Sequence, residues 1–305
     1  MFNAFHQYRK FSGIIMLVFS CLIFFAEPVQ AACPAADGSV VGSQVAIFQD
    51  CTETKVGGGT SITLASPAGT AVGDLLVAII STDGNPTITP PGTWTTINQG
   101  PAAGNAARLG VFYRVASLTG AQNHAFTLSA SEHIVGSILR FTNHDGIGAI
   151  STAATGTGSP TAPSVTPVRN NSLVIRVAGF DDDDGPIDPA TIITGHRNIT
   201  QDDSGNGAQT TSMAAAYINQ VTGGIASGTA LFLSAGGGEQ WRSISFVVRP
   251  TLPAVAFRIT HSGSGSTCAP TTVTFTAVNQ NGGTVNYTGP LTITAPNGNW
   301  ASIGD

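Results

Sequence analysis

The chain has 305 residues, of which 12 are basic and 17 acidic, so its formal net charge at pH 7 is −5. Proteins that bind nucleic acid or anionic lipid need concentrated Lys and Arg, and this sequence has no basic segment of that kind. We therefore predict neither activity. With 42% hydrophobic residues, 10% charged residues and 37 glycines, the composition predicts folded, turn-rich domains rather than a disordered chain.

Residues 1–31 have the order of a secretory signal peptide. The basic pair Arg9-Lys10 precedes an apolar run over 14–25, and a Val-Gln-Ala tripeptide ends the segment. The run is shorter than the roughly 20 residues of a membrane-spanning helix, so we expect cleavage after that alanine and no membrane span in the mature chain. Lipidation of Cys33, which follows two alanines, is the alternative. Either way the chain is predicted to be exported.

Three cysteines follow the signal peptide, at positions 33, 51 and 268. In an oxidising compartment, Cys33 and Cys51 could close a short loop as a disulfide. Cys268 would then be either a free thiol or the partner of a cysteine beyond the end of the sequence.

Hydrophobic residues between 44 and 249 recur with a period of two, which is typical of antiparallel strands with one solvated face. The runs 74–80 and 133–141 are apolar on both faces and are predicted to be central strands. Turn-rich segments such as 143–146 separate the strands. About a dozen short strands predict an all-β, jelly-roll-like antiparallel β-sandwich over residues 32–249.

A proline-containing linker is predicted at 250–253, because proline cannot continue a central strand. Residues 254–305 alternate again, with Val255, Phe257 and Ile259 on one face, but they supply only three or four strands. So few strands cannot bury both faces of a sandwich. We therefore interpret this segment as the start of a second, truncated Ig-like β domain.

Three elements of the C-terminal segment carry a family resemblance: a strand ending in His-Ser-Gly-Ser-Gly (261–265), the turn Cys268-Ala-Pro, and a Val-Thr-Phe strand (273–275). Together they resemble the opening of an Ig-like module of MshQ-like proteins. That family is associated with biogenesis of the mannose-sensitive haemagglutinin type IV pilus in Gram-negative bacteria. The segments that resemble β-sandwich modules of large bacterial surface and phage-tail-like proteins are 73–78, 88–94, 111–116 and 246–250.

The resemblance implies a non-enzymatic cell-surface or envelope protein that serves pilus biogenesis or adhesion. Its partners would be surface proteins or glycans. The expected location is the cell surface, the outer membrane or the extracellular space. The family supplies no catalytic residues to carry over to this chain.

The densest charge cluster is the run of four aspartates from Asp181, with Asp188 close by. Adjacent carboxylates repel one another, and Ca²⁺ binds several carboxylate and carbonyl oxygens on flexible loops. The simpler interpretation is a solvated acidic turn, and the alternative is a calcium site with Asp181, Asp183 and Asp188 as candidate ligands. The chain lacks the acidic residue that ends a complete EF-hand loop.

Trp94 follows a Pro-Pro-Gly turn, where an aromatic ring could be displayed for stacking on a sugar. The alternative is that Trp94 packs over the end of the sandwich. A displayed tryptophan together with calcium would make the chain a secreted, calcium-dependent, lectin-like module, which is our second functional hypothesis.

Catalysis has little support in the sequence. Glycoside hydrolysis needs two carboxylates that flank the scissile bond, and Glu132 with Glu239 is the pair considered. The sequence has no Gly-x-Ser-x-Gly elbow, phosphate-binding loop or zinc-binding motif. We therefore predict that the chain is not an enzyme.

Overall fold

A computed structural model of the chain describes residues 45–181, 193, 195–204, 210–220, 222–232, 239–252, 255–261, 273–279, 284, 285, 287 and 291. The predicted signal peptide lies outside the described residues. Antiparallel β-strands dominate the described part, and its only helical element is the short 3₁₀ turn η1 (Ala103–Asn105). This confirms the predicted all-β sandwich. No described residue belongs to a helix of the length and apolarity needed to cross a membrane.

The first sheet is formed by residues 47–142 and has the strand order β1-β6-β2-β5-β4, with β3 paired to β6. Every pairing in it is antiparallel. Its strands are β1 (Ile47–Ala65), β2 (Leu75–Asp83), β3 (Ile88–Thr89), β4 (Thr95–Pro101), β5 (Ala107–Val115) and β6 (Asn123–Thr142).

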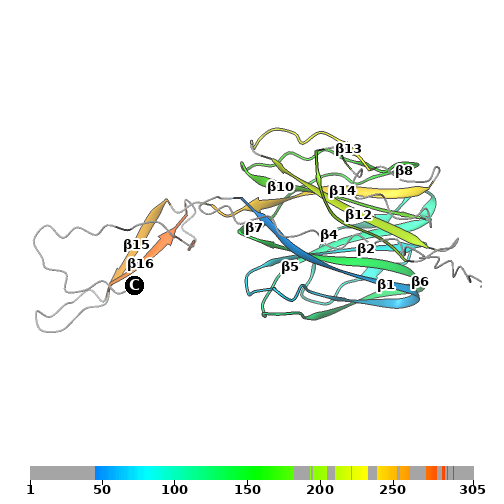
Figure 1. Ribbon diagram of the computed structural model, residues 1–305, viewed down its shortest axis with the longest axis horizontal. Helices are drawn as coiled ribbons and strands as arrows, with labels where there is room; N and C mark the ends of the chain where they lie inside the picture. The colour runs from blue at the N-terminus through cyan, green and yellow to red at the C-terminus, as the bar shows by residue number, and fades with distance from the viewer. Residues whose placement is uncertain are drawn as a thin grey trace, which may run out of the picture.

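The second sheet is formed by residues 144–250 and has the order β11-β12-β10-β14-β7, with β8 paired to β14. It faces the first sheet (Figure 1). A small extra pair joins β9 (Thr161–Ala162) to β13 (Ala230–Leu231). The other strands are β7 (His144–Ile150), β8 (Ala154–Thr157), β10 (Ser172–Asp181), β11 (Arg197–Asp203), β12 (Thr211–Gln220) and β14 (Gln240–Pro250).

The chain crosses between the two sheets once, at Asn143, whose φ of 53° reverses the backbone between β6 and β7. Each sheet is therefore built from one contiguous half of the domain. This connectivity refines the jelly-roll expectation, because strands of the two halves do not alternate between the sheets.

The central core lies between the sheets. Side chains alternate between the two faces along β2 and β10, so every second residue of these strands enters the core. Leu75, Val77 and Ile79 point into it from β2, and their counterparts on β10 are Leu173, Ile175 and Val177. All six side chains are buried. The opposite face of β2 is buried too, in a second cluster that includes Leu76, Ala78 and Ile80. The run 74–80 is thus apolar on both faces because both faces are covered.

The two halves share one topology. When the five main strands of each half are numbered in chain order, both sheets have the order 1-5-2-4-3. The third strand of each half also has a β-bulge at the same place. The extra residue is Ile97 in β4 and Ile199 in β11, and both side chains enter the central core. The sandwich therefore consists of two equivalent five-stranded units packed face to face.

The two units use different segments to cover the outer faces of their sheets. In the first half, β1 and β6 are 19 and 20 residues long and shift register around Gly57–Ser61. Their far ends, with Ile62, Leu64 and Phe126, fold back over the outer face of β2. In the second half, β9 and the segment near Phe232 cover β10.

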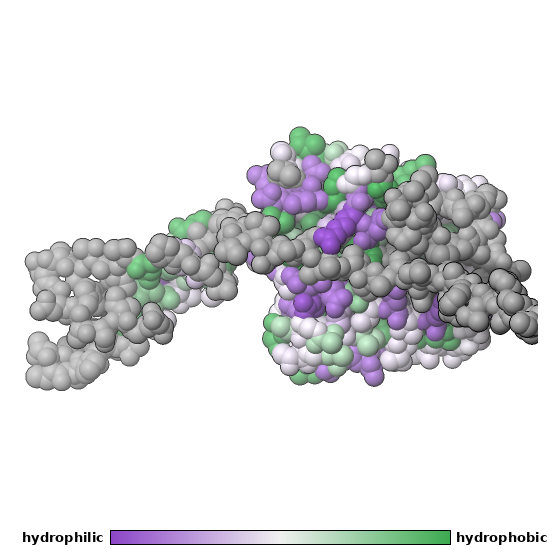
Figure 2. Space-filling view, viewed as in Figure 1, coloured by the Kyte–Doolittle hydropathy of each residue, from purple (hydrophilic) through white to green (hydrophobic). Residues whose placement is uncertain are grey.

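The described C-terminal residues form a separate two-stranded sheet of β15 (Ala256–His261) and β16 (Val273–Val278). It lies to one side of the sandwich in Figure 1. Its assignment to an Ig-like domain, like the proposed linker, stays a prediction. On the face of the sandwich seen in Figure 2, hydrophilic and apolar residues are interleaved.

Candidate functional site

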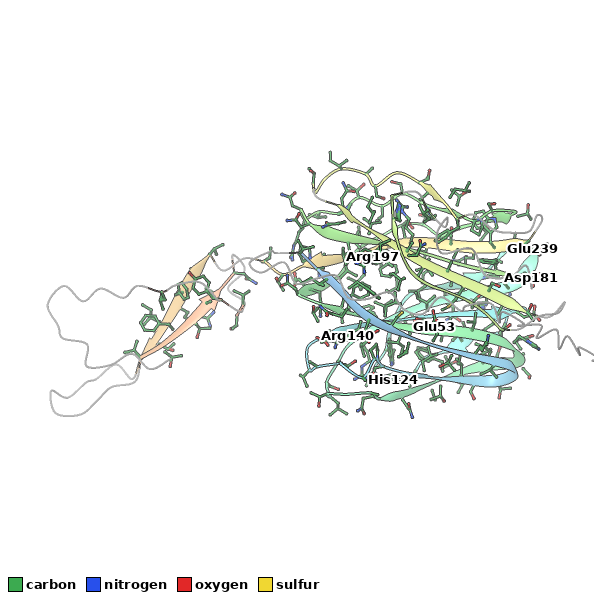
Figure 3. All side chains as sticks on the ribbon, in the orientation of Figure 1. Glu53, His124, Arg140, Asp181, Arg197 and Glu239 are labelled. Carbon is green, nitrogen blue, oxygen red and sulfur yellow. The ribbon has the colours of Figure 1, made fainter. Side chains whose placement is uncertain are left out.

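Only part of the predicted calcium site lies in the described residues. Asp181 is the last residue of β10 and is half-buried, at the end of the sandwich remote from β15 and β16 (Figure 3). Asp183 and Asp188 lie outside the described residues. Across the described ranges, no group of three or more His, Cys, Asp or Glu side chains could hold a metal ion. The calcium site stays a prediction.

Cys51 lies on β1 at the central core, is 5% exposed and is disulfide-bonded. Its Sγ atom is 3.8 Å from the carbonyl oxygen of Ile199 on the facing sheet. Cys33 and Cys268 lie outside the described residues, so the pairing of Cys33 with Cys51 stays a prediction.

Trp94 is only 6% exposed and packs against two rings of β6. Its indole meets the His124 imidazole edge-on, with the ring centroids 5.1 Å apart, and the Phe126 ring at 5.4 Å. The Arg114 guanidinium lies 6.0 Å from the indole centroid. The tryptophan thus has no open face for stacking on a sugar. Its packing is closer to the alternative given above, in which Trp94 packs over the end of the sandwich.

Glu132 and Glu239 occupy corresponding places in the two halves. Glu132 lies on β6, and Glu239 immediately precedes β14. Burial raises the pKa of the Glu132 carboxyl, and the charge of Asp83 raises it further. Neither glutamate lines the pocket described next.

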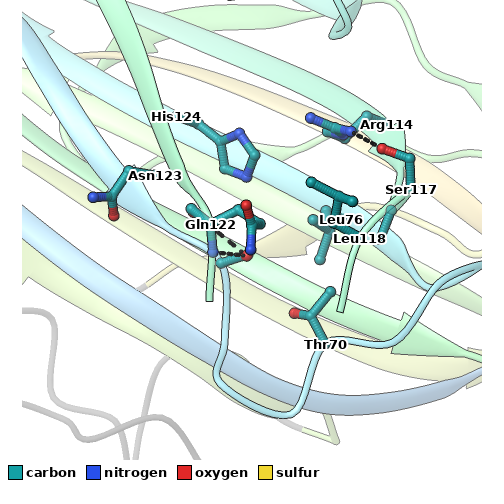
Figure 4. A pocket seen from close by; sticks show the side chains of 10 residues that line it. Thr70, Leu76, Arg114, Ser117, Leu118, Gln122, Asn123 and His124 are labelled. Carbon is teal, nitrogen blue, oxygen red and sulfur yellow. Dashed lines mark hydrogen bonds between the residues drawn. The ribbon is translucent and has the colours of Figure 1, made fainter. Parts of the chain in front are cut away.

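A pocket of about 160 Å³ lies at the outer face of the first sheet, between the β1–β2 and β5–β6 connections (Figure 4). Backbone hydrogen bonds hold the two connections together: Ser66 N donates to Gln122 O at 2.9 Å, and Gly120 N donates to Thr70 O at 2.8 Å. The residues that line the pocket are Ser66, Thr70, Leu76, Arg114, Ala116, Ser117, Leu118, Gln122, Asn123 and His124.

The charge in this pocket comes from Arg114. Its Nη1 and Nη2 atoms donate to the hydroxyls of Thr93 and Ser117, both at 3.0 Å, while its buried Nε atom has no hydrogen-bond partner among the described residues. No carboxylate lines the pocket. The guanidinium therefore makes the pocket cationic.

His124 is the other titratable group of the pocket. It is 7% exposed, and its Nε2 atom has no hydrogen-bond partner in the part of the chain that the structure describes. Burial lowers the pKa of the imidazole, and the charge of Arg114 lowers it further. His124 is therefore neutral at pH 7 and can serve as a hydrogen-bond donor or acceptor, according to its tautomer.

Sequence reasoning did not find this pocket. The period-two pattern places Arg114 on the polar face of its strand, but the covering ribbon of β1 and β6 makes that face half-buried. His124 has no ligand-like neighbour in the sequence. Its contact with Trp94 joins β6 to the segment before β4, and only the fold shows that contact.

No family model, curated protein or solved structure matches this chain.

Proposed function

We propose that the chain is an exported, non-enzymatic surface or envelope protein of the MshQ-like kind, which serves pilus biogenesis or adhesion. In this proposal the β-sandwich is the binding module. The observation that carries it is the Arg114 pocket, formed by two connections that are held together at the face of a well-packed sandwich. Binding residues are commonly placed on loops that a rigid scaffold positions.

The chemistry of the pocket lining favours binding over turnover. Its residues offer hydroxyl, amide and guanidinium groups that can hold a polar ligand in a fixed orientation. Acid–base catalysis commonly uses titratable groups with separated roles, and the described lining offers only the His124 imidazole beside the Arg114 guanidinium.

The test is to express the full chain in a Gram-negative host and follow its processing and location. We expect an N-terminus at Ala32, digestion of the chain by protease added to intact cells, and more cell adhesion than in the same host without the chain. An unprocessed chain that is protected from external protease would contradict export. A processed, exposed chain that does not alter adhesion or piliation would contradict the proposed role.

A further inference from the structure

We propose that the Arg114 pocket binds a single acidic sugar residue, with the sugar carboxylate on the Arg114 guanidinium. This inference rests on the proposed binding role of the sandwich and names the class of ligand. The two halves of the sandwich place equivalent residues on the outer faces of equivalent strands, so the second half shows what the fold requires at these positions.

The equivalent place in the second half is closed and apolar. Across three adjacent strands of the first sheet, Leu76 is flanked by Arg114 and Arg140. The corresponding residues of the second sheet are Val174, flanked by Ile218 and Val247. Val174 and Val247 are fully buried in one cluster with Val165, and Ile218 packs against that cluster. The fold therefore accepts aliphatic side chains at these positions. Its topology does not require the two guanidinium groups of the first half.

The two arginines differ in whether an acidic partner is present. Arg140 lies 3.5 Å from the carboxylate of Asp74, and both side chains are largely buried. Within the described ranges, Arg114 donates to two neutral hydroxyls and to no carboxylate. A guanidinium at a pocket without a carboxylate attracts an anion, and its planar array of donors matches the geometry of a carboxylate.

The remaining lining fits a sugar. Gln122 donates its side-chain amide to Thr119 O at 3.3 Å, which leaves the Gln122 amide oxygen as an acceptor for a hydroxyl. Leu118 also lines the pocket and is 59% exposed, so it offers an apolar contact for the C–H face of a sugar ring.

The size of the pocket sets the size of the ligand. Its volume is about 160 Å³, whereas pockets for drug-sized molecules have about 300–1,000 Å³. The pocket therefore suits one monosaccharide unit, such as the terminal residue of a glycan, and not an extended oligosaccharide.

Calorimetric titration of the full chain with glucuronic acid, glucose and acetate tests the proposal. We expect glucuronic acid to bind at least tenfold more tightly than either glucose or acetate, because only glucuronic acid combines the carboxylate with the hydroxyls. Equal affinities for glucuronic acid and glucose would overturn the carboxylate contact. Equal affinities for glucuronic acid and acetate would reduce the site to a simple anion site. Failure of glucuronic acid to bind at 10 mM would overturn the proposal as a whole.

Two variants connect the binding to the pocket. Arg114→Gln removes the charge but keeps an amide that can reach the neighbouring hydroxyls, and we expect it to weaken glucuronic acid binding at least tenfold. Arg169→Gln is the matched control, because Arg169 pairs with Asp145 elsewhere on the sandwich, and it should leave the affinity unchanged. Thermal unfolding of both variants shows whether each is folded. A folded Arg114→Gln chain that binds like the original would refute the assignment.

The results of the sugar-binding experiments can be distinguished from the results of the location and adhesion tests. A chain that binds glucuronic acid but is not exposed on cells would refute the surface role and keep the pocket assignment. A chain that is exposed and promotes adhesion without binding any acidic sugar would refute the pocket assignment alone.

Discussion

The most informative stability experiment concerns Arg176 on β10, a cation with no solvent exposure. Its guanidinium donates to the backbone carbonyls of Pro163, Ser227 and Gly228 at 2.9–3.1 Å, and its Nε donates to Nε2 of His196 at 2.8 Å. One side chain thus holds segments from three places in the sequence on the outer face of the second sheet. We predict that Arg176→Met strongly destabilises the sandwich.

The size of the effect follows from these contacts. A hydrogen bond to a charged group contributes about 1.5–3 kcal/mol. The four bonds named above are lost, together with two longer ones, at 3.3 Å, to the hydroxyls of Ser227 and Ser245. The loss is partly offset, because a cation no longer has to be desolvated, at a cost of several kcal/mol. The neutral acceptors that lose their donor cost about 1–3 kcal/mol each when they stay buried and unsatisfied, so after the offset we expect a net cost of about 3–5 kcal/mol. For a domain of 150–250 residues, this corresponds to a fall in Tm of about 6–20 °C.

Urea and thermal unfolding of the full chain, followed by tryptophan fluorescence, measure this loss. Arg169→Met is the control. Its ion pair with Asp145 is partly exposed, and we expect a change of less than about 1 kcal/mol. Limited proteolysis of Arg176→Met should give new cleavage within 222–232, the segment that loses the guanidinium. If Arg176→Met unfolds within 1 kcal/mol of the original chain, the guanidinium does not hold these segments and our reasoning is wrong.

Three further predictions follow from the fold. Reducing the Cys51 disulfide should lower the free energy of unfolding by about 2–4 kcal/mol, and a non-reducing peptide map should link Cys51 to Cys33; a link to another cysteine would contradict the sequence prediction. Because burial and Arg114 lower the pKa of His124, the unfolded chain gains a proton near pH 6.5 before the folded chain does, so stability should fall as pH drops from 7 towards 5. His124→Asn should flatten that dependence, and an unchanged slope would exclude His124 as a cause. Leu139→Ala in the central core should cost about 2–5 kcal/mol, against less than about 1 kcal/mol for the 44% exposed Ile150→Ala; equal costs would contradict the assigned core.

The strands were predictable because a buried strand face requires apolar residues, and these are visible in the local sequence. The runs 74–80 and 133–141 are apolar on both faces, and they form parts of β2 and β6, adjacent strands inside the first sheet. The segment 143–146 was predicted as a turn from its Asn and Gly residues. Only Asn143 reverses the chain, and β7 begins at His144. Turn residues mark the position of a reversal well but do not fix where the next strand begins.

The duplication and the pocket were not predictable, because both depend on which strands pair. The two halves have few identical residues at equivalent positions, and the matching bulges at Ile97 and Ile199 become evident only when the strand registers are known. Trp94 likewise carries a turn signal that suggests display. Its burial depends on His124 and Phe126 from a distant strand.

The two halves differ in where an arginine lies on the outer face of the sheet. On the outer face of the second strand of each half, the first has Ala78 where the second has Arg176. The guanidinium of Arg176 finds acceptors among the segments that cover it, so it acts as part of the fold. Arg114 occupies a position where the second half has Ile218 in an apolar cluster, and among the described residues it has no acidic partner of the kind that Asp74 provides for Arg140. A charged side chain at a position that the equivalent half fills with an aliphatic one is the kind of local exception expected at a functional site. This difference between the halves supports the proposal that binding resides in the first half.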